Sequence, residues 1–592
     1  MPTLGIVRRS AYHDSVALML AQRQAKEQPG VDEVGLVMAT DANKALLRES
    51  GLDFPGLADA GPDDLVVAAR ASTAEAAQSA IALAQELLTR RRAGSGGHPP
   101  GDDHRPRTIA SALRELPDAR LAVISVPGRF ARGVAREAID AGLHVLMFSD
   151  NVPLEHEVEL KTRAGRRGLL VMGPDCGTAL IGGAALGFAN RVRQGRIGLV
   201  AAAGTGLQEV TSLIHRFGGG VSHAIGTGGR DLSTAVGGAT MLQGLRALAL
   251  DLQTDVIVLI SKPPAEQVAG RILAAAASCG KPVIAAFIGA RVEPRDHVEG
   301  AATLEDAARL AVRRAYEIDV PALALRSLPS QEAGRLAPDQ RFVRGLYTGG
   351  TLCYEALIVL RPHLGPVRSN TPLLPSEGLE SMVRSQEHTV IDMGGGEFTQ
   401  GRLHPMIDPA LRLQRLQQEA ADPQTAIILL DVVLGYGAHP EPASVLAPVV
   451  RTLRERAHAG GRYLSVVASV CGTEEDPQDF NAQRDALIEA GVLVEDSNAR
   501  AARLAGLIGE AHGSRGVALV APAIRAATSA PTWPEVGPVG ALLRDPPAVI
   551  NVGLELFAES LQAQGVPVVS VAWRPPAGGK QHLLDLLDKL EA

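Results

Sequence analysis

Two glycine-rich turns constrain the fold of this chain more than any other feature. They span Ala203–Gln208 and Thr348–Cys353, and they follow apolar runs at Ile197–Ala202 and Phe342–Tyr347. Each turn opens a segment with helical spacing, so the sequence predicts the same strand–turn–helix unit twice. Glycine lets the backbone approach a ligand closely, and the free N–H groups of a first helical turn bind anions. The pair indicates two helix N-termini directed at one phosphate or carboxylate; the alternative is two plain β-to-α connections.

Length and composition indicate a soluble protein of several domains. With 592 residues the chain exceeds a single core, and roughly three to five domains are expected. Apolar residues make up 46% and aromatic residues 3%, which favours tightly packed α/β layers over aromatic stacking surfaces for nucleic acid. The net charge of −7 argues against nucleic acid and anionic membranes as partners.

Cysteine usage and the apolar pattern point to the cytoplasm. Four cysteines, Cys176, Cys279, Cys353 and Cys471, form no Cys-x-x-Cys pair, which indicates a reducing compartment and no structural zinc. The first residues carry no signal-peptide pattern, and no apolar stretch reaches about 18 residues. The sequence therefore predicts a cytoplasmic protein without a metal site or a membrane span.

Apolar runs alternate with helical segments along the chain, which predicts an α/β fold class with doubly wound parallel sheets. The clearest composition break is a Gly- and Pro-rich stretch at 93–106, which we interpret as a flexible linker. The other predicted units are an N-terminal α/β segment of a Rossmann-like domain at 1–92, the remainder of that CoA-binding-type domain at 107–193, two flavodoxin-like ligase-type domains at 194–320 and 340–530, and a C-terminal α/β tail at 545–592.

Several motifs, taken in order, resemble succinyl-CoA synthetase. Ser125–Ala131, Glu137–Leu143 and Met172–Gly177 are similar to the CoA-binding domain of its α subunit. Gly195–Val200 and Ile225–Gly229 are similar to the flavodoxin-like domain that follows. The third α/β unit resembles the C-terminal ligase domain of the β subunit. In that family the two corresponding helix N-termini hold the phosphate of a phosphohistidine, so the resemblance implies that both turns contact phosphate.

A closer resemblance, to the FdrA family, covers most of the chain. It is carried by Arg8–Ser15, Gly187–Asn190, Gly226–Ser233, Gly349–Glu355, His404–Asp408 and Asp431–Gly437. FdrA proteins are broadly acyl-CoA synthetase-like. Members from allantoin catabolism are implicated, with two other subunits, in oxamate carbamoyltransferase, which interconverts oxalurate plus phosphate with oxamate plus carbamoyl phosphate. The tail motifs Val549–Glu555 and Trp573–Gly579 resemble the start of a companion subunit of such systems.

Three features of the synthetase are missing. Its phosphorylated histidine lies in a Gly-His-Ala-Gly loop that this chain lacks; the nearby His297 is predicted to be a solvated loop histidine. The glutamate that pairs with that histidine is replaced by Lys262, whose charge suits free phosphate, with a plain surface lysine as the alternative. Neither an ATP-grasp domain nor a Gly-x4-Gly-Lys-[Ser/Thr] loop is present, so no ATP chemistry is expected. The turn at Arg8–Asp14 lacks glycines for a nucleotide phosphate, which argues against CoA.

Further candidates combine reactive groups with loops at strand ends. Cys353 lies in the first turn of the second helix, where thiol pKa values fall, so it is a candidate nucleophile or a small core residue. Arg230 is a candidate ligand for a carboxylate or phosphate, or the partner of Asp231 in an ion pair. Glu397 is a candidate acid or base, and His404 a polar group beside it. Turn geometry or capping explains four further residues as well as chemistry does: Cys176, Asp408, Asp431 and His439.

These inferences predict a subunit of an oxamate carbamoyltransferase-like enzyme that moves a carbamoyl group between phosphate and a small amide or amine. Expected partners are the small-molecule substrate and companion subunits in an oligomer; no cofactor is required, and CoA stays an open possibility. The alternatives are a CoA ligase or acyl-CoA transferase, and a non-catalytic scaffold subunit. The predicted site comprises phosphate-binding Gly204, Thr205, Gly206, Gly349, Gly350 and Thr351, catalytic Lys262, Arg230, Glu397 and Cys353, and substrate-binding Gly228, Gly229, Gly395, Gly396 and His404.

Overall fold

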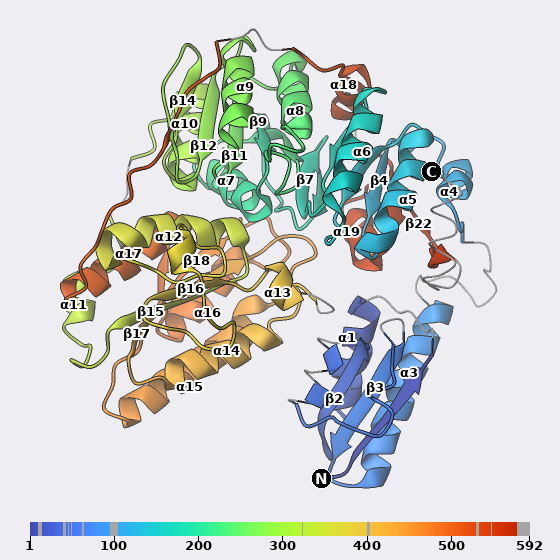
Figure 1. Cartoon of the computed structure of the whole chain (residues 1–592), viewed down its shortest axis with the longest axis vertical. Helices are drawn as coiled ribbons and strands as arrows, with labels where there is room; N and C mark the ends of the chain where they lie inside the picture. Colours follow the sequence, from blue (N-terminus) through green and yellow to red (C-terminus); the bar gives the residue numbers. More distant parts are fainter. Residues whose placement is uncertain are drawn as a thin grey trace.

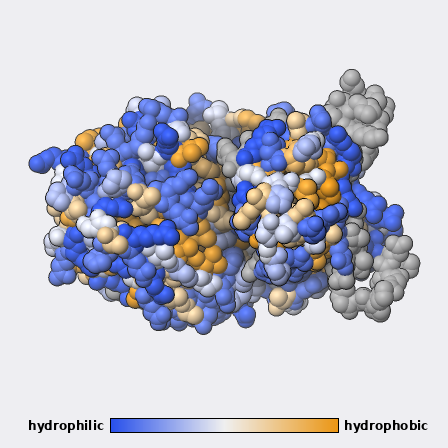
Figure 2. Space-filling model, turned by 90° about the horizontal axis from the view of Figure 1, so that it is seen from below, coloured by the Kyte–Doolittle hydropathy of each residue, from blue (hydrophilic) through white to orange (hydrophobic). Residues whose placement is uncertain are grey.

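The computed structural model describes residues 1–9, 15–39, 43–44, 47–48, 50–61, 64–94, 105–321, 324–399, 403–528, 532–545 and 547–576 (Figure 1). Within these ranges the larger sheets are mostly parallel and covered by helices, so the predicted α/β class is confirmed (Figure 1). The described helices include none that is long and apolar enough to cross a membrane. Seen from below, the surface is mostly hydrophilic, and apolar residues gather beside the furrow between two lobes (Figure 2).

The N-terminal module forms a sheet of its own, in the order β1-β3-β2, with β3 antiparallel to both neighbours. This corrects the prediction that residues 1–92 begin the Rossmann-like domain. Alternate residues of β3 enter two different apolar clusters, because helices cover one face of the sheet and the 47–60 segment covers the other. The elements are β1 (Thr3–Arg8), α1 (Ser15–Lys26), β2 (Val31–Met38), β3 (Leu65–Ala71) and α3 (Ala74–Gly94).

The Rossmann-like domain is completed by the C-terminal part of the chain. Its parallel sheet has the order β22-β21-β4-β5-β6, so two strands of the predicted separate tail lie beside strands from residues 121–172. This is a second correction: the tail, rather than residues 1–92, supplies the missing strands. The elements are α4 (Ile109–Glu115), β4 (Leu121–Ile124), α5 (Gly128–Asp140), β5 (His144–Met147), α6 (Leu154–Gly165), β6 (Val171–Met172), α18 (Gly537–Arg544), β21 (Val549–Val552), α19 (Glu555–Ala563) and β22 (Val568–Val571).

The second domain contains a seven-stranded sheet in the order β14-β12-β11-β9-β10-β7-β8. It is parallel from β14 to β10, and the β7–β8 hairpin joins antiparallel to β10. The elements are β7 (Thr178–Ile181), β8 (Ala184–Gly187), β9 (Gln194–Ala201), α7 (Gly204–Arg216), β10 (Val221–Gly226), α8 (Ala239–Leu250), β11 (Val256–Ser261), α9 (Glu266–Ala277), β12 (Val283–Phe287), β13 (Arg291–Val292), β14 (Val298–Gly300) and α10 (Leu304–Tyr316).

The third domain has an all-parallel sheet in the order β16-β15-β17-β18-β19. Every residue of β17 is buried, since helices cover both faces of the sheet. The elements are α11 (Pro329–Ala333), β15 (Phe342–Tyr347), α12 (Gly350–Leu364), η1 (Pro375–Glu377), β16 (Thr389–Asp392), α13 (Gly396–Thr399), α14 (Ala410–Ala421), β17 (Thr425–Val433), α15 (Pro442–Ala459), β18 (Ser465–Cys471), α16 (Phe480–Glu489), β19 (Leu493–Glu495) and α17 (Asn498–Ala511).

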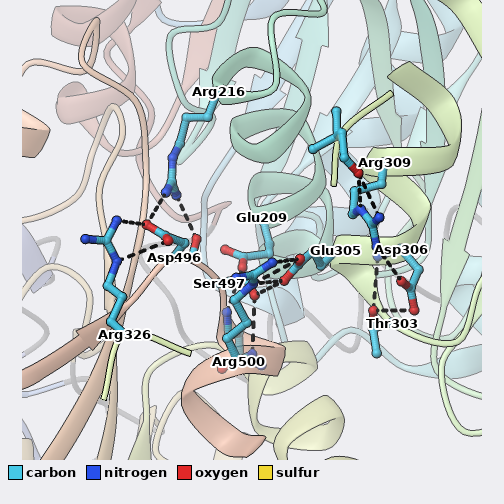
Figure 3. Close-up of polar contacts among 12 residues, drawn as sticks. Glu209, Arg216, Thr303, Glu305, Asp306, Arg309, Arg326, Asp496, Ser497 and Arg500 are labelled. Carbon is cyan, nitrogen blue, oxygen red and sulfur yellow. Dashed lines mark hydrogen bonds and ion pairs between the residues drawn. The ribbon is translucent and has the colours of Figure 1, made fainter. Parts of the chain in front are cut away.

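The second and third domains share one continuous apolar core, in which α7 packs against α12 and α10 against α17. Polar contacts also cross this boundary: Arg500 pairs with Glu305 at 2.6 Å and Arg216 with Asp496 at 3.4 Å (Figure 3). From α17 the chain returns along the second domain, where β20 (Ala523–Ile524) pairs with β13, and then enters the Rossmann-like domain (Figure 1). The two glycine turns lie at this shared boundary.

Candidate functional site

The two glycine turns, residues 204–206 and 349–351, meet face to face, and we call this pair the clasp. The N–H of Thr351 donates to Oγ1 of Thr205 over 3.4 Å. A Cβ built on Gly349 would lie 2.8 Å from the same oxygen, closer than packed atoms tolerate. The apposition that the sequence predicts is therefore present, and glycine is required for it because a larger residue would separate the two helices.

The clasp leaves backbone N–H groups available to a ligand. The N-cap residues of α7 and α12, Ala203 and Gly349, make no side-chain capping bond, whereas Thr303 caps α10 and Ser497 caps α17. In the first turn of α12 the Thr351 N–H is bonded to Thr205. Gly204 is exposed and Gly350 is half-buried, so both N-termini reach solvent. A first turn without a cap carries unpaired N–H donors and the positive end of the helix dipole. This arrangement can hold a phosphate or carboxylate between two helices.

Asp431 shapes the second turn from behind. Its fully buried carboxylate accepts the N–H groups of Thr348 and Gly349, each at 2.8 Å. Arg412 balances its charge at 2.9 Å. Since the backbone and Arg412 occupy these carboxylate oxygens, Asp431 acts as a structural residue of the turn rather than as a group of the open site.

Lys262 and Asp392 lie beside the clasp, one from each ligase-type domain. Lys262 follows β11, and its Nζ lies 5.5 Å from the ring centre of Tyr354 on α12. Asp392 ends β16; its Oδ1 accepts the Gly394 N–H at 3.0 Å, and its Oδ2 lies 2.5 Å from the position of a Cβ on Gly350. Burial raises the pKa of Asp392 to about 6, and Lys262 opposes that rise. The site therefore holds a cation and a carboxyl group able to exchange a proton near neutral pH.

Asp175 adds a charged group from the Rossmann-like domain. Its φ of 55° is left-handed, a conformation that non-glycine residues rarely adopt. The residue is exposed, yet the protein around it partly desolvates its carboxyl group. This desolvation and the charges of Asp150 and Asp392 raise its pKa to about 6, while Arg230 and Lys262 oppose the rise. Three domains thus contribute to one site. Sequence reasoning named neither Asp175 nor Asp392 as a site residue, although both follow strand carboxyl ends, where open α/β sheets bind ligands.

Arg230 is held by a buried ion network. Its Nε lies 3.0 Å from Glu157, and its Nη2 donates to the Val152 carbonyl at 2.8 Å. The predicted alternative of an Arg230–Asp231 ion pair is wrong, because Asp231 pairs with Lys161 at 2.8 Å. Lys161 also pairs with Glu157, at 2.9 Å. The network joins α6 to the loop after β10 and orients Arg230, whose side chain stays 45% exposed.

The glycines predicted to bind substrate differ in their surroundings. Gly228 has a φ of +83°, and a Cβ there would collide with the Pro174 carbonyl, so backbone packing explains this glycine. A Cβ on Gly229 would lie 3.9 Å from Asp175 Oδ2, which places this residue at the edge of the site. In the loop after β16, a Cβ on Gly395 would lie 2.8 Å from Oε2 of the exposed Glu397.

Cys353 is not placed to act as a nucleophile, which corrects the sequence prediction. Its side chain is fully buried in the core shared by the second and third domains. Burial, followed by the charge of Asp392, raises the pKa of this thiol far above its ordinary value. Burial likewise raises the pKa of Cys176 to about 12. Desolvation therefore outweighs the helix dipole at Cys353, and neither thiol supplies a thiolate at neutral pH.

The two candidate histidines, His404 and His297, lie in different surroundings. His404 directs Nε2 towards Gly394, 2.6 Å from the position of a Cβ there, and burial lowers its pKa to about 4, so the ring is neutral. Its predicted neighbour Asp408 accepts the Ala410 N–H at the start of α14. The exposed His297 precedes β14, at the amino edge of the sheet, whereas α7 begins at the carboxyl edge. His297 is therefore a surface histidine away from the clasp.

A separate pocket of about 550 Å³ opens on the Rossmann-like domain. Val552 and Val571, the last residues of β21 and β22, form its floor. The strand order reverses between β21 and β4, which is the switch point where doubly wound sheets bind ligands. Its basic and aromatic lining includes Arg107, Arg136, Arg574, Phe130 and Trp573.

A model of the CoA-ligase family matches residues 346–508, and a model described as "AllF, heavy metal-associated domain" matches residues 1–104. Escherichia coli K12 YahF, itself described as uncharacterized, is 41% identical over 506 residues, which cover 84% of this chain and 97% of YahF. The chain belongs to the YahF family. The third domain of this YahF-family protein contains the CoA-ligase match, as its resemblance to a synthetase β subunit implies.

More distant relatives are subunits of CoA ligases. An α subunit of succinate–CoA ligase from Archaeoglobus fulgidus is 28% identical over 193 residues, 32% of this chain and 64% of that subunit. A sulfoacetate–CoA ligase subunit from Bilophila wadsworthia is 30% identical over 197 residues, 32% of this chain and 64% of that subunit. The match spans less than two thirds of each subunit. These matches relate the YahF-family chain to the succinyl-CoA synthetase superfamily, which confirms that part of the sequence prediction.

Two solved structures show partial similarity of fold. ATP citrate lyase from Methanothrix soehngenii, in complex with citrate and coenzyme A, matches 35% of this chain and 37% of its own with 22% identity and a TM-score of 0.28. A dinucleotide-forming acetyl-coenzyme A synthetase from Korarchaeum cryptofilum matches 67% and 83% with 16% identity and a TM-score of 0.25.

The name of the N-terminal match mentions heavy metals, yet the donor set does not fit a soft-metal site. Residues 1–104 contain no cysteine, the ligand that soft metals prefer. Among the described residues of the whole chain, no three His, Cys, Asp or Glu side chains are grouped to hold a metal ion. In its described part, the N-terminal module has a sheet, helices and an apolar core of its own but no metal centre.

Proposed function

We propose that this YahF-family chain is a subunit of a CoA-ligase-type enzyme and that its clasp binds the phosphoryl group of an acyl phosphate or of free phosphate. The observation that carries the proposal is the apposition of two helix N-termini without side-chain caps, with Lys262 beside them. Backbone N–H groups and one ammonium group match the charge and the acceptor geometry of a phosphate dianion.

The reaction would be acyl transfer at the carbonyl carbon of the acyl phosphate. A nucleophile attacks that carbon, the C–O bond to phosphate breaks, and the phosphate leaves with the electron pair of that bond. Positive charge at the clasp stabilises the departing phosphate. Asp175 and Asp392, with pKa values raised to about 6, are suited to accept the proton of the attacking group and to return it in the reverse direction. Charge stabilisation and positioning suffice for such a step without a phosphohistidine.

The Rossmann-like pocket supports CoA as the acyl acceptor. Its volume of about 550 Å³ suits a nucleotide-sized group. Guanidinium groups of Arg107, Arg136 and Arg574 would meet the phosphates, and the Trp573 ring would stack on a base. Acidic groups work against this assignment: Glu137 and Asp140 also line the pocket. The first turn of α19, at the switch point, carries Glu555, a charge that repels phosphate.

Carbamoyl transfer is the second candidate, with carbamoyl phosphate as the acyl phosphate and a small amide such as oxamate as acceptor. Three observations favour it: the resemblance to the FdrA family, the AllF name of the model that matches residues 1–104, and a lysine where the synthetase has a glutamate. Companion subunits are expected for either reaction, since the ligase relatives are themselves subunits.

Calorimetry on the full chain tests the proposal and separates its two versions. Phosphate, acetyl phosphate, carbamoyl phosphate and CoA are titrated in turn, first into the wild-type protein. Binding of CoA together with acetyl phosphate supports the ligase version, whereas binding of carbamoyl phosphate without CoA supports carbamoyl transfer. If none of the phosphate compounds binds, the proposal fails and a scaffold role gains support.

Glycine variants show whether the clasp is the binding site. In Gly349→Ala and Gly206→Ala the new Cβ would lie 2.8 Å from Thr205 Oγ1 and 2.9 Å from Thr351 Cγ2, so the two turns must move apart. We expect both variants to weaken phosphate binding at least tenfold. Gly540→Ala, in α18, is the matched control, because a Cβ there meets no atom within 4 Å. Equal affinities in all three variants would exclude the clasp.

A further inference from the structure

The two clasp helices carry the same short pattern. Each begins with Gly-Thr, and a glutamate follows four residues after the threonine: Glu209 in α7 and Glu355 in α12. Both glutamates are almost completely buried, at 2% and 1% exposure. In a helix, a residue four positions on lies one turn below the threonine on the same face. The glutamates therefore occupy equivalent places beneath the two halves of the clasp.

Both glutamates bind one residue, Asn498, the first residue of α17. The backbone N–H of Asn498 donates to Oε1 of Glu209 at 2.9 Å. Its Nδ2 donates to Oε2 of Glu355 at 2.8 Å and to the Leu352 carbonyl at 2.9 Å. One residue thus connects the two clasp helices directly. Ser497, which caps α17, fixes the position of Asn498 in turn.

The surroundings of this link are crowded with carboxyl groups. Glu305 from α10 lies beside it and pairs with Arg500 of α17 at 2.6 Å (Figure 3). Burial and the neighbouring Glu209 and Glu305 raise the pKa of Glu355 to about 8, and burial also raises the pKa of Glu209. Within the described residues Oδ1 of Asn498 is buried and has no hydrogen-bond partner. The Glu355 carboxyl group is held between two donors, since its Oε1 accepts the Leu304 N–H at 2.7 Å and its Oε2 accepts Nδ2 of Asn498 at 2.8 Å.

We infer that Glu209, Asn498 and Glu355 form a brace that sets the separation of the two clasp turns, with Asn498 as a positioning residue for the phosphoryl group bound there. The inference rests on the proposed function for its ligand, but the mechanical link rests on the contacts alone. A substitution at position 498 keeps the backbone N–H that Glu209 accepts but removes the side-chain donor to Glu355, so the link between the two helices is broken at its α12 end.

Hydrogen exchange with mass spectrometry tests the link without any ligand. In the full chain, Asn498→Ala is expected to speed exchange at least tenfold in the hydrogen-bonded second turn of α12, which carries Glu355. Asn551→Ala is the matched control, since Asn551 is equally buried but lies in β21, away from the clasp. If only α17 exchanges faster, or if the control has the same effect, the brace is refuted. Should Asn498→Ala fail to fold, Asn498→Ser, which retains a hydroxyl donor, is measured instead.

Titration with inorganic phosphate then tests the positioning role. Asn498→Ala should weaken phosphate binding about tenfold, the loss expected for one buried hydrogen bond to a carboxyl group. Asn551→Ala, the control of the exchange experiment, should bind phosphate within twofold of the wild type. Unchanged affinity in Asn498→Ala overturns the positioning role. If the wild-type protein binds no phosphate, the proposed function fails, and the exchange result alone decides on the brace.

Discussion

Replacing Lys161 by methionine is a sharp test of the network that orients Arg230. The Lys161 ammonium donates to Glu157 at 2.9 Å, to Asp231 at 2.8 Å and to the Thr227 carbonyl at 2.9 Å. The side chains of Lys161, Glu157 and Asp231 are each at most 2% exposed. Lys161→Met keeps an unbranched side chain, one atom shorter, and removes the charge, so two buried carboxylates lose their common cation.

The magnitude follows from what each carboxylate retains. Breaking a buried pair by removing one partner typically costs about 3–5 kcal/mol. Glu157 still has Arg230 at 3.0 Å, and Asp231 still accepts the N–H groups of Thr240 and Met241 at 3.1 and 2.9 Å. We therefore expect the lower end, about 3 kcal/mol. With a urea slope of about 2–3 kcal/mol per molar, the unfolding midpoint should fall by about 1 M.

Tryptophan fluorescence reports on the relevant part of the molecule. The chain has two tryptophans; Trp533 packs against the core beside α8, and Trp573 lies 5.5 Å from the Phe130 ring. Arg163→Met on the same helix is the control, because its ion pair with Asp140 is exposed and worth about 0–1 kcal/mol. A midpoint for Lys161→Met no lower than that of the control would refute the reasoning.

Three further predictions use the same reading of burial and packing. Gly228→Ala should destabilise the protein by about 2 kcal/mol more than Gly183→Ala in urea unfolding, because both have φ of +83° but only the first Cβ meets backbone; equal losses would contradict the packing argument. Alkylation of the native protein should label the half-buried Cys279 before the fully buried Cys353, as peptide mass spectrometry can check; faster labelling of Cys353 would restore it as a candidate nucleophile. The pKa of Asp392 is raised from 3.8 to about 6, so the folded protein loses stability as the pH rises from about 4 to 6 and this carboxyl group ionises. Asp392→Asn should therefore raise the thermal midpoint more at pH 7.5 than at pH 4.5. The opposite order would be evidence against the raised pKa.

The clasp could be predicted from the sequence because its physics is local. An apolar run, a glycine turn and a helical segment fix a strand–turn–helix unit, and parallel sheets present such turns at one edge. Two such units, at Gly204 and Gly350, were enough to predict that the two turns face each other, and the anion between them stays a prediction. In the structure, the hydrogen bond from the Thr351 N–H to Oγ1 of Thr205 is the contact through which the two turns meet.

What failed in the prediction depends on partners distant in sequence. The apolar run at Val549–Val552 announces a strand but not its neighbour, which is β4, more than four hundred residues earlier. Position in a first helical turn suggested a reactive Cys353, but helical phase directs that side chain into the core. Likewise, adjacency in sequence suggested Arg230 with Asp231, whereas neighbouring residues of a loop point to different partners.

The late arrival of β21 and β22 has a consequence for how the protein is made. The strands β4, β5 and β6 leave the ribosome long before Val549, and at roughly 5–20 residues per second the delay is about 20–75 seconds. During that interval the fully buried strand β4 has an unpaired apolar edge, which is a site for aggregation. A prematurely terminated chain would keep that edge exposed permanently. The sheet is complete only after β21 and β22 have been synthesised. A chain that stops earlier would therefore be degraded because of its exposed β4 edge.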